Sequence, residues 1–140
     1  MDSGDLLWKS AYLGDDEIAQ RKLKANLLFA AMEAVKIDAL TPGEGDFIFG
    51  IDFLKEGAAR HHLPYVSANL EASDGSALFP PFVVVERAGL RIGITGITAP
   101  AVLGKELKAA EPIASLTAVV KTLKGPERAD LVVLLSHQGA

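Results

Sequence analysis

The sequence contains no cysteine, which excludes disulfides, iron–sulfur clusters, zinc knuckles and thiol nucleophiles. It also lacks an excess of positive charge, because 18 acidic residues outnumber 14 basic residues and the basic residues are scattered along the chain. A protein that binds a phosphate backbone needs a basic stripe or patch. We therefore expect no nucleic-acid partner.

Long apolar runs are absent as well. The charge-free run that comes closest to a membrane span, Ile92 to Gly104, has 13 residues and is interrupted by glycine and proline, whereas a membrane helix needs about 20 apolar residues. The first five residues include two aspartates, whereas a secretory signal begins with positive charge and continues with an apolar run. We expect neither membrane insertion nor a signal segment in this chain.

The residues that are present predict a globular fold. Apolar residues make up 49% of the chain and charged residues 23%, which is enough for a core and unlike the composition of a disordered protein. A chain of 140 residues is of the size of a single domain.

Three segments have apolar residues at intervals of three and four, which is typical of an amphipathic helix. They are residues 17–36, 47–60 and 116–123. In the first helix the predicted buried stripe consists of Leu23, Leu27, Leu28, Ala31, Ala34 and Val35.

Five further segments are predicted to be strands: 37–41, 63–68, 82–86, 90–97 and 131–135. The third and fourth are joined by a short link with a glycine and form a hairpin, whereas the last is a run of five aliphatic residues that indicates a strand covered on both faces. Residues 71–75 are predicted to be a polar loop, and Gly93 and Gly96 to mark close packing against a neighbour. The alternation predicts an α/β fold with a mixed, largely parallel sheet and flanking helices.

Polar residues follow predicted strands at Pro42–Asp46 and Ser136–Gly139, and a third polar group lies at Asp2–Asp5. Open α/β sheets bind ligands at the carboxyl ends of their strands, and carboxylates with an imidazole suit a divalent metal ion. Taken alone, Asp2 is better explained as a cap and His61–His62 as the polar end of a helix. His137 is a stronger candidate because it follows a predicted buried strand.

These segments resemble the 5′-nucleotidases, within the calcineurin-like metallophosphoesterases. Gly4-Asp5 matches the Gly-Asp motif of that family, residues 42–47 lie where the family has Gly-Asn-His-Glu-Phe, and residues 136–139 match its later histidine loop. Similar scaffold segments are Tyr65–Leu70, Phe79–Phe82 and Gly93–Thr98.

The resemblance implies the first half of the metallophosphoesterase α-β-β-α sandwich. The Asp-x-His and Gly-His-x-His motifs of the family have no counterpart in residues 1–140, so we expect one partial domain that lacks the first and last metal-binding motifs. A partial domain is expected to expose apolar surface and to form a homo-oligomer. The family also implies an extracytoplasmic, periplasmic location.

The same resemblance implies metal-dependent hydrolysis of a phosphorylated small molecule such as a nucleotide, with manganese, zinc or a similar divalent ion. Asp5 and His137 carry over as metal ligands, and Glu44 stands at the asparagine ligand position, where it adds negative charge. Gly45 stands at the position of the catalytic histidine and cannot donate a proton. We therefore expect a weak or incomplete metal site and impaired or absent hydrolysis, with no catalytic residue assigned. The alternative is a non-catalytic binding or assembly module that retains the scaffold.

Overall fold

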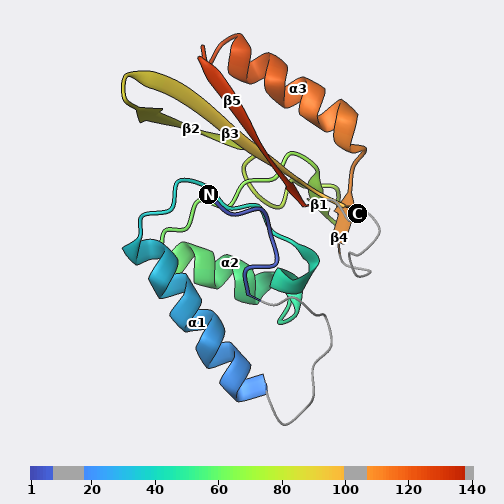
Figure 1. Ribbon diagram of the computed structural model, residues 1–140. Coiled ribbons are helices and arrows are strands. Elements are labelled where there is room, and N and C mark those ends of the chain that lie inside the picture. The colour runs from blue at the N-terminus through green and yellow to red at the C-terminus, as the bar shows by residue number, and fades with distance from the viewer. Residues whose placement is uncertain (8–17, 100–106, 138–140) are drawn as a thin grey trace.

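The structure is a computed structural model that describes residues 1–7, 18–99 and 107–137. Its elements, in chain order, are α1 (Ile18–Ala34), η2 (Glu44–Phe47), α2 (Ile51–Arg60), β1 (Leu70–Ala72), β2 (Phe82–Arg87), β3 (Leu90–Thr98), β4 (Leu107–Ala109), α3 (Pro112–Lys124) and β5 (Leu131–His137). Figure 1 shows α1 and α2 on one side of the long strands and α3 on the other. The predicted α/β class is confirmed. None of the helices described is long and apolar enough to span a bilayer.

The larger sheet has the order β2-β3-β5. β2 and β3 form the predicted antiparallel hairpin, whose link includes Ala88 and Gly89 in left-handed conformation. β3 and β5 are parallel, with Ile92 opposite Leu131 and Thr98 opposite His137. This register places His137 at the carboxyl end of two adjacent strands.

A second, smaller layer consists of parallel bridges that join Asp2 to Leu40 and Leu40 to Tyr65. The strands predicted at 37–41 and 63–68 are thus each reduced to a single bridged residue. Proline explains this difference, because Pro42 and Pro64 flank the bridged residues and have no N–H group to extend a ladder.

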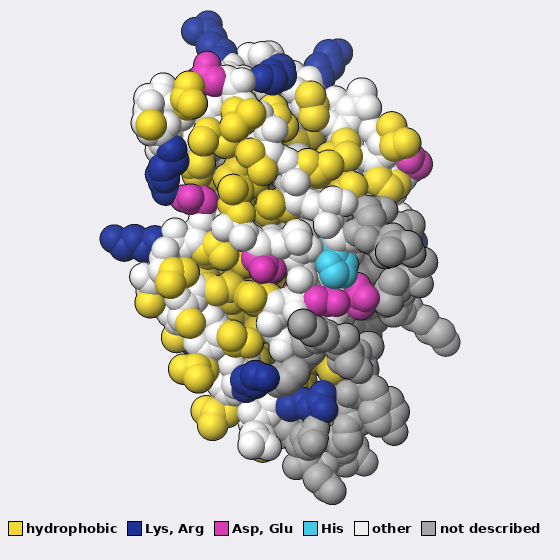
Figure 2. All heavy atoms as spheres, in the orientation of Figure 1, with side chains coloured by type: hydrophobic (Ala, Val, Ile, Leu, Met, Phe, Trp, Pro, Cys, Tyr) yellow, Lys and Arg dark blue, Asp and Glu magenta, His cyan; other side chains and the backbone are white. Residues whose placement is uncertain are grey.

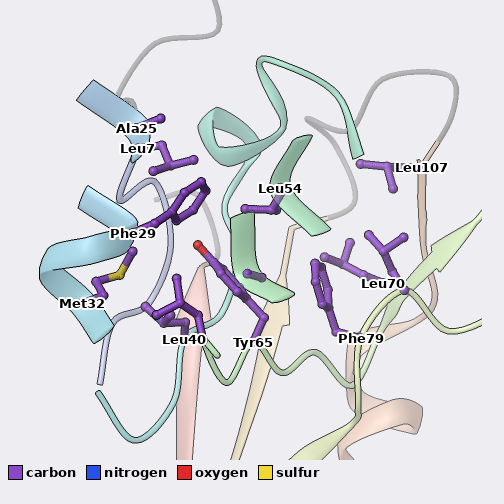
Figure 3. Close-up of a cluster of buried hydrophobic side chains, with 13 residues drawn as sticks. Leu7, Ala25, Phe29, Met32, Leu40, Leu54, Tyr65, Leu70, Phe79 and Leu107 are labelled. Atoms are coloured by element: carbon purple, nitrogen blue, oxygen red, sulfur yellow. The ribbon is translucent and has the colours of Figure 1, made fainter. Parts of the chain in front are cut away.

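The smaller layer separates two apolar clusters. Leu40 and Tyr65 pack with Phe29 and Leu54 of α1 and α2, as Figure 3 shows. Their chain neighbours Ala39 and Val66 face the opposite way and pack against the larger sheet, in a cluster with Ile94 and Leu135. A third cluster, which includes Val119, Leu123 and Val132, joins that sheet to α3. The layer order is therefore α-β-β-α, as the resemblance implied.

The buried face of α1 differs from the prediction. Ala25, Phe29 and Met32 are buried, whereas Leu23 and Leu27 of the predicted stripe are each 70% exposed. Because α1 has apolar residues on two opposite faces, spacing alone cannot decide which face packs on the core.

Two three-residue strands form a separate antiparallel pair, β1 with β4. The prediction of a polar loop at 71–75 is therefore wrong for Glu71 and Ala72, which belong to β1. A strand this short has no periodicity of its own, and its partner lies more than 30 residues along the chain.

The close packing predicted at Gly93 and Gly96 is confirmed. A Cβ atom at Gly93 would lie 2.6 Å from Leu123 Cδ2, and one at Gly96 would overlap the side chain of Thr41. The contact with Thr41 brings the segment that follows it to the end of β3, where the Thr98 hydroxyl donates to the Pro42 carbonyl at 2.6 Å.

The larger sheet leaves apolar side chains in contact with solvent. The prediction that the strand at 131–135 is covered on both faces is wrong, because Leu131 and Leu134 of β5 are 49% and 44% exposed. Figure 2 shows hydrophobic side chains gathered over this part of the molecule. We expect the chain to self-associate with increasing concentration, because β5 is an aliphatic strand that pairs only with β3 among the residues described. Light scattering over a concentration series should show a rising mass that Leu134→Lys reduces; a monomer throughout would contradict this expectation.

Candidate metal centre

The three predicted metal ligands lie together. Asp5 comes from the N-terminal segment, Glu44 is the first residue of η2 and His137 is the last residue of β5. Each offers one ligand atom, and these atoms all lie within 4.8 Å of one another. Figure 2 shows histidine and acidic side chains side by side at the surface, below the larger sheet.

The imidazole of His137 has an oxygen partner at each ring nitrogen. Nδ1 lies 3.0 Å from the Ser3 carbonyl oxygen, and Nε2 lies 2.7 Å from Glu44 Oε2 and 3.7 Å from Asp5 Oδ2. Burial opposes a charge on this ring, but the hydrogen bond to Glu44, the carboxylates of Asp5 and Glu44 and the Ser3 carbonyl together raise the pKa of His137. The Ser3 contact holds the ring so that Nε2 faces the two carboxylates.

Two glycines make this approach possible. Gly4 has φ +111°, and a Cβ atom there would lie 2.6 Å from His137 Nδ1. A Cβ atom at Gly43 would overlap the Asp5 carboxylate and lie 2.8 Å from His137 Nε2. The histidine and the carboxylate therefore pack directly against backbone that only glycine leaves open.

Asp46 is a functional candidate that the sequence prediction did not single out. It is only 1% exposed, and its carboxylate accepts hydrogen bonds from three backbone N–H groups, those of Asp5, Leu7 and Gly43. Burial raises the pKa of Asp46 to about 6, against the opposing effect of the hydrogen bonds from Leu7 and Gly43 and with a further increase from the charges of Asp5 and Asp2. The only sequence signal was its place in the segment 42–47.

This raised pKa has a consequence for stability. Between the ordinary value of 3.8 and about 6, the folded state holds a proton on Asp46 that the unfolded state has lost. The contribution of Asp46 to the free energy of unfolding should therefore decrease as the pH rises through this range. Urea denaturation from about pH 4 to about pH 7 should show a decrease in the wild type that is smaller in Asp46→Asn. Parallel curves for the two proteins would contradict the assignment.

Structural partners are present for three further residues that the sequence analysis considered: Asp2, His61 and Gly45. Asp2 Oδ1 accepts a hydrogen bond from the Gly4 N–H at 3.0 Å, so Asp2 caps a local turn. His61 follows α2 and its Nδ1 lies 2.8 Å from Glu33 Oε2, away from the metal ligands. Gly45 contributes its backbone N–H, which donates to Asp5 Oδ1 at 2.7 Å. Gln138 and Gly139 of the predicted histidine loop lie outside the described residues.

No protein-family model matches the chain. Among curated proteins, the trifunctional nucleotide phosphoesterase protein YfkN of Bacillus subtilis (strain 168) is 26% identical in a gapped alignment of 161 positions that covers 99% of this chain and 11% of that protein. The 2′,3′-cyclic-nucleotide 2′-phosphodiesterase/3′-nucleotidase of Yersinia enterocolitica is 32% identical in a gapped alignment of 158 positions that covers 99% of this chain and 24% of that protein. The chain thus spans a quarter or less of the length of these relatives.

Solved structures that are similar to this chain are also phosphoesterases and nucleotidases. The calcineurin-like phosphoesterase YfkN from Bacillus subtilis matches 99% of this chain and 48% of its own with a TM-score of 0.77 and 25% identity. The 5′-nucleotidase precursor from Thermus thermophilus matches 99% of this chain and 27% of its own with a TM-score of 0.76 and 28% identity.

Proposed function

We propose that this chain, which is similar in sequence and fold to the 5′-nucleotidase-like calcineurin-like phosphoesterases, uses Asp5, Glu44 and His137 to bind one divalent metal ion for phosphoric ester hydrolysis. The resemblance predicted from the sequence is confirmed by the curated and solved relatives. The observation that supports the metal proposal is the convergence of the three ligand atoms within 4.8 Å.

The residues fit a divalent ion. Two carboxylates and an imidazole are donors that manganese and zinc both accept. Ligand atoms about 2 Å from a shared ion lie at most about 4 Å apart, so the cluster has to contract by about 1 Å or less. When bound, the ion supplies Lewis-acid polarisation of a phosphoryl oxygen.

The chain's own residues define the rest of the proposal. Ser3 holds Nδ1 of His137 and leaves Nε2 to bind the ion, while Glu44 adds a negative charge that an asparagine would not. Gly45 places no side chain at the position of the family's catalytic histidine, so proton donation to the leaving group is lost there. We therefore propose a weak site with impaired hydrolysis of a phosphorylated small molecule such as a nucleotide. Since one solved relative is a precursor, we also propose an extracytoplasmic location.

The test is titration of the chain with Mn²⁺ and Zn²⁺ by calorimetry, followed by an aryl phosphatase assay with the same ions. We expect one ion per chain in the wild type, a loss of affinity of about 100-fold or more in His137→Ala, and unchanged binding in His62→Ala, which alters an exposed histidine. Absence of binding in the wild type would overturn the metal proposal. Turnover at the rate of ordinary phosphatases would overturn the proposal of impaired hydrolysis.

A second candidate function is a non-catalytic binding or assembly module. Gly45 favours it, as does the 2.7 Å contact by which Glu44 already engages His137 Nε2. This candidate predicts that the wild type has no phosphatase turnover. It also predicts that His137→Ala leaves partner binding or self-association of the chain unchanged. Loss of that function in His137→Ala would favour the metal centre instead.

A further inference from the structure

We infer that Asp46 is a positioning residue whose carboxylate locks together the two chain segments that carry Asp5 and Glu44. The inference rests on the proposed metal site and names a residue on which its geometry depends. Asp46 is not itself among the three clustered ligands.

One oxygen of Asp46 joins the two segments directly. Its Oδ2 accepts from the Asp5 N–H at 3.1 Å and from the Gly43 N–H at 2.9 Å, so the backbone of one ligand and the residue that precedes another share a single acceptor. Oδ1 accepts from the Leu7 N–H at 2.9 Å and fixes the N-terminal segment at a second point. The hydrogen bonds from Asp5 and Leu7 join Asp46 to residues about 40 positions away in the sequence.

Hydrogen bonds between the two segments run in both directions. Asp5 Oδ1 accepts from the Gly45 N–H at 2.7 Å, so each segment holds the other through a carboxylate and a backbone amide. This bond occupies one oxygen of Asp5 and leaves the other, Oδ2, 3.7 Å from His137 Nε2. The rotamer of Asp5 that faces the cluster thus depends on where Gly45 lies, and Asp46 fixes that position.

The third proposed ligand, His137, is linked through Thr98 to the segment that carries Glu44. His137 pairs with Thr98 in the β3–β5 register, and the Thr98 hydroxyl donates to the Pro42 carbonyl at 2.6 Å. Pro42 immediately precedes Gly43, whose N–H is bound by Asp46. A shift of residues 42–44 would therefore displace Glu44 relative to both Asp5 and His137.

Asparagine cannot reproduce this arrangement. Asparagine has one acceptor oxygen for three donors, and its NH₂ group would face a backbone N–H. Burying a carboxylate is costly unless it is well paired. Among the residues described, all hydrogen bonds to this buried acid come from the segments that carry the ligands, which points to a role in their geometry rather than in packing.

The experiment compares Mn²⁺ affinity by calorimetry and the visible absorption spectrum of the Co²⁺ complex in four proteins: the wild type, Asp46→Asn, Asp46→Glu and Leu123→Ala. Leu123→Ala is the matched control, because it destabilises the core below α3, away from the ligands. We expect about tenfold or greater weakening of Mn²⁺ binding and a changed Co²⁺ spectrum in Asp46→Asn. A smaller but measurable weakening is expected in Asp46→Glu, which has the residue type of the family motif at this position but a side chain longer by one methylene group. Asp46→Glu retains both acceptor oxygens and keeps the test valid if Asp46→Asn does not fold.

Two outcomes would overturn the inference: unchanged binding and spectrum in the Asp46 variants, or equal weakening in Leu123→Ala. Failure of the wild type to bind Mn²⁺ would instead overturn the proposed function. In that case amide exchange at Leu7 and Gly43 decides the inference. Faster exchange in the Asp46 variants alone supports the lock, and unchanged exchange overturns it.

Discussion

Replacing Phe29 by alanine is expected to lower the free energy of unfolding by about 3–5 kcal/mol. The Phe29 side chain is fully buried, lies 6.1 Å from the Phe53 ring by centroid distance, and packs against α2 where Gly57 has no side chain to obstruct it. Leu27→Ala, two residues earlier in the same helix, should cost less than about 0.5 kcal/mol because Leu27 is 70% exposed. Urea denaturation followed by circular dichroism measures both.

The pair of variants tests which face of α1 packs on the core. Both substitutions shorten a large apolar side chain to the same methyl group, so they differ chiefly in the environment of that side chain. A larger loss in Leu27→Ala than in Phe29→Ala would mean that the helix packs through the stripe that the sequence pattern favoured. The arrangement of the first apolar cluster would then be wrong.

The affinity for Mn²⁺ is expected to fall about tenfold for each unit by which the pH lies below the pKa of His137. The Nε2 atom must lose its proton before it binds an ion, and the contacts with Glu44, Asp5 and Ser3 outweigh burial and raise the pKa of this histidine. Weakening should therefore begin at a higher pH than for an ordinary histidine. Calorimetry in buffers of different ionisation enthalpy measures both the affinity and the protons released.

Glu44→Gln provides the control for this pH dependence. The variant removes the negative charge from the 2.7 Å partner of Nε2, so the pKa of His137 should decrease and the onset of weakening should move to lower pH. The affinity at high pH should also decrease, because the variant removes the charge of one of the proposed ligands. An affinity that does not change between about pH 5.5 and about pH 8.5 in the wild type would contradict the role of His137 as a ligand.

The sequence was informative where a local pattern decides the structure. The hairpin of β2 and β3 follows from two β-rich runs with a glycine link, and β5 from its five aliphatic residues. The convergence of Asp5, Glu44 and His137 could be predicted because the resemblance placed each of them in a metal-binding motif. Neither result required knowledge of distant contacts.

The features that sequence reasoning missed all depend on which distant segments of the chain contact a residue. Leu27 and Phe29 are both apolar and both suit a helix, and only the position of α2 determines that Phe29 is the buried one. Glu71 pairs with Lys108, which no pattern near either residue indicates. Asp46 lies within the segment that resembles the family motif, but only the structure shows that three amides from two segments surround its carboxylate.

The contact between Ser3 and His137 spans 134 positions of the sequence, and the contact between Glu44 and His137 spans 93. Closing loops of this length costs conformational entropy before any contact is gained, and folds dominated by such contacts form slowly. The ligand cluster should therefore be completed late in folding, after the hairpin and the helices. An ion that binds only the completed cluster would slow unfolding rather than accelerate folding, so the resistance of this chain to unfolding would depend on the metal content of its surroundings.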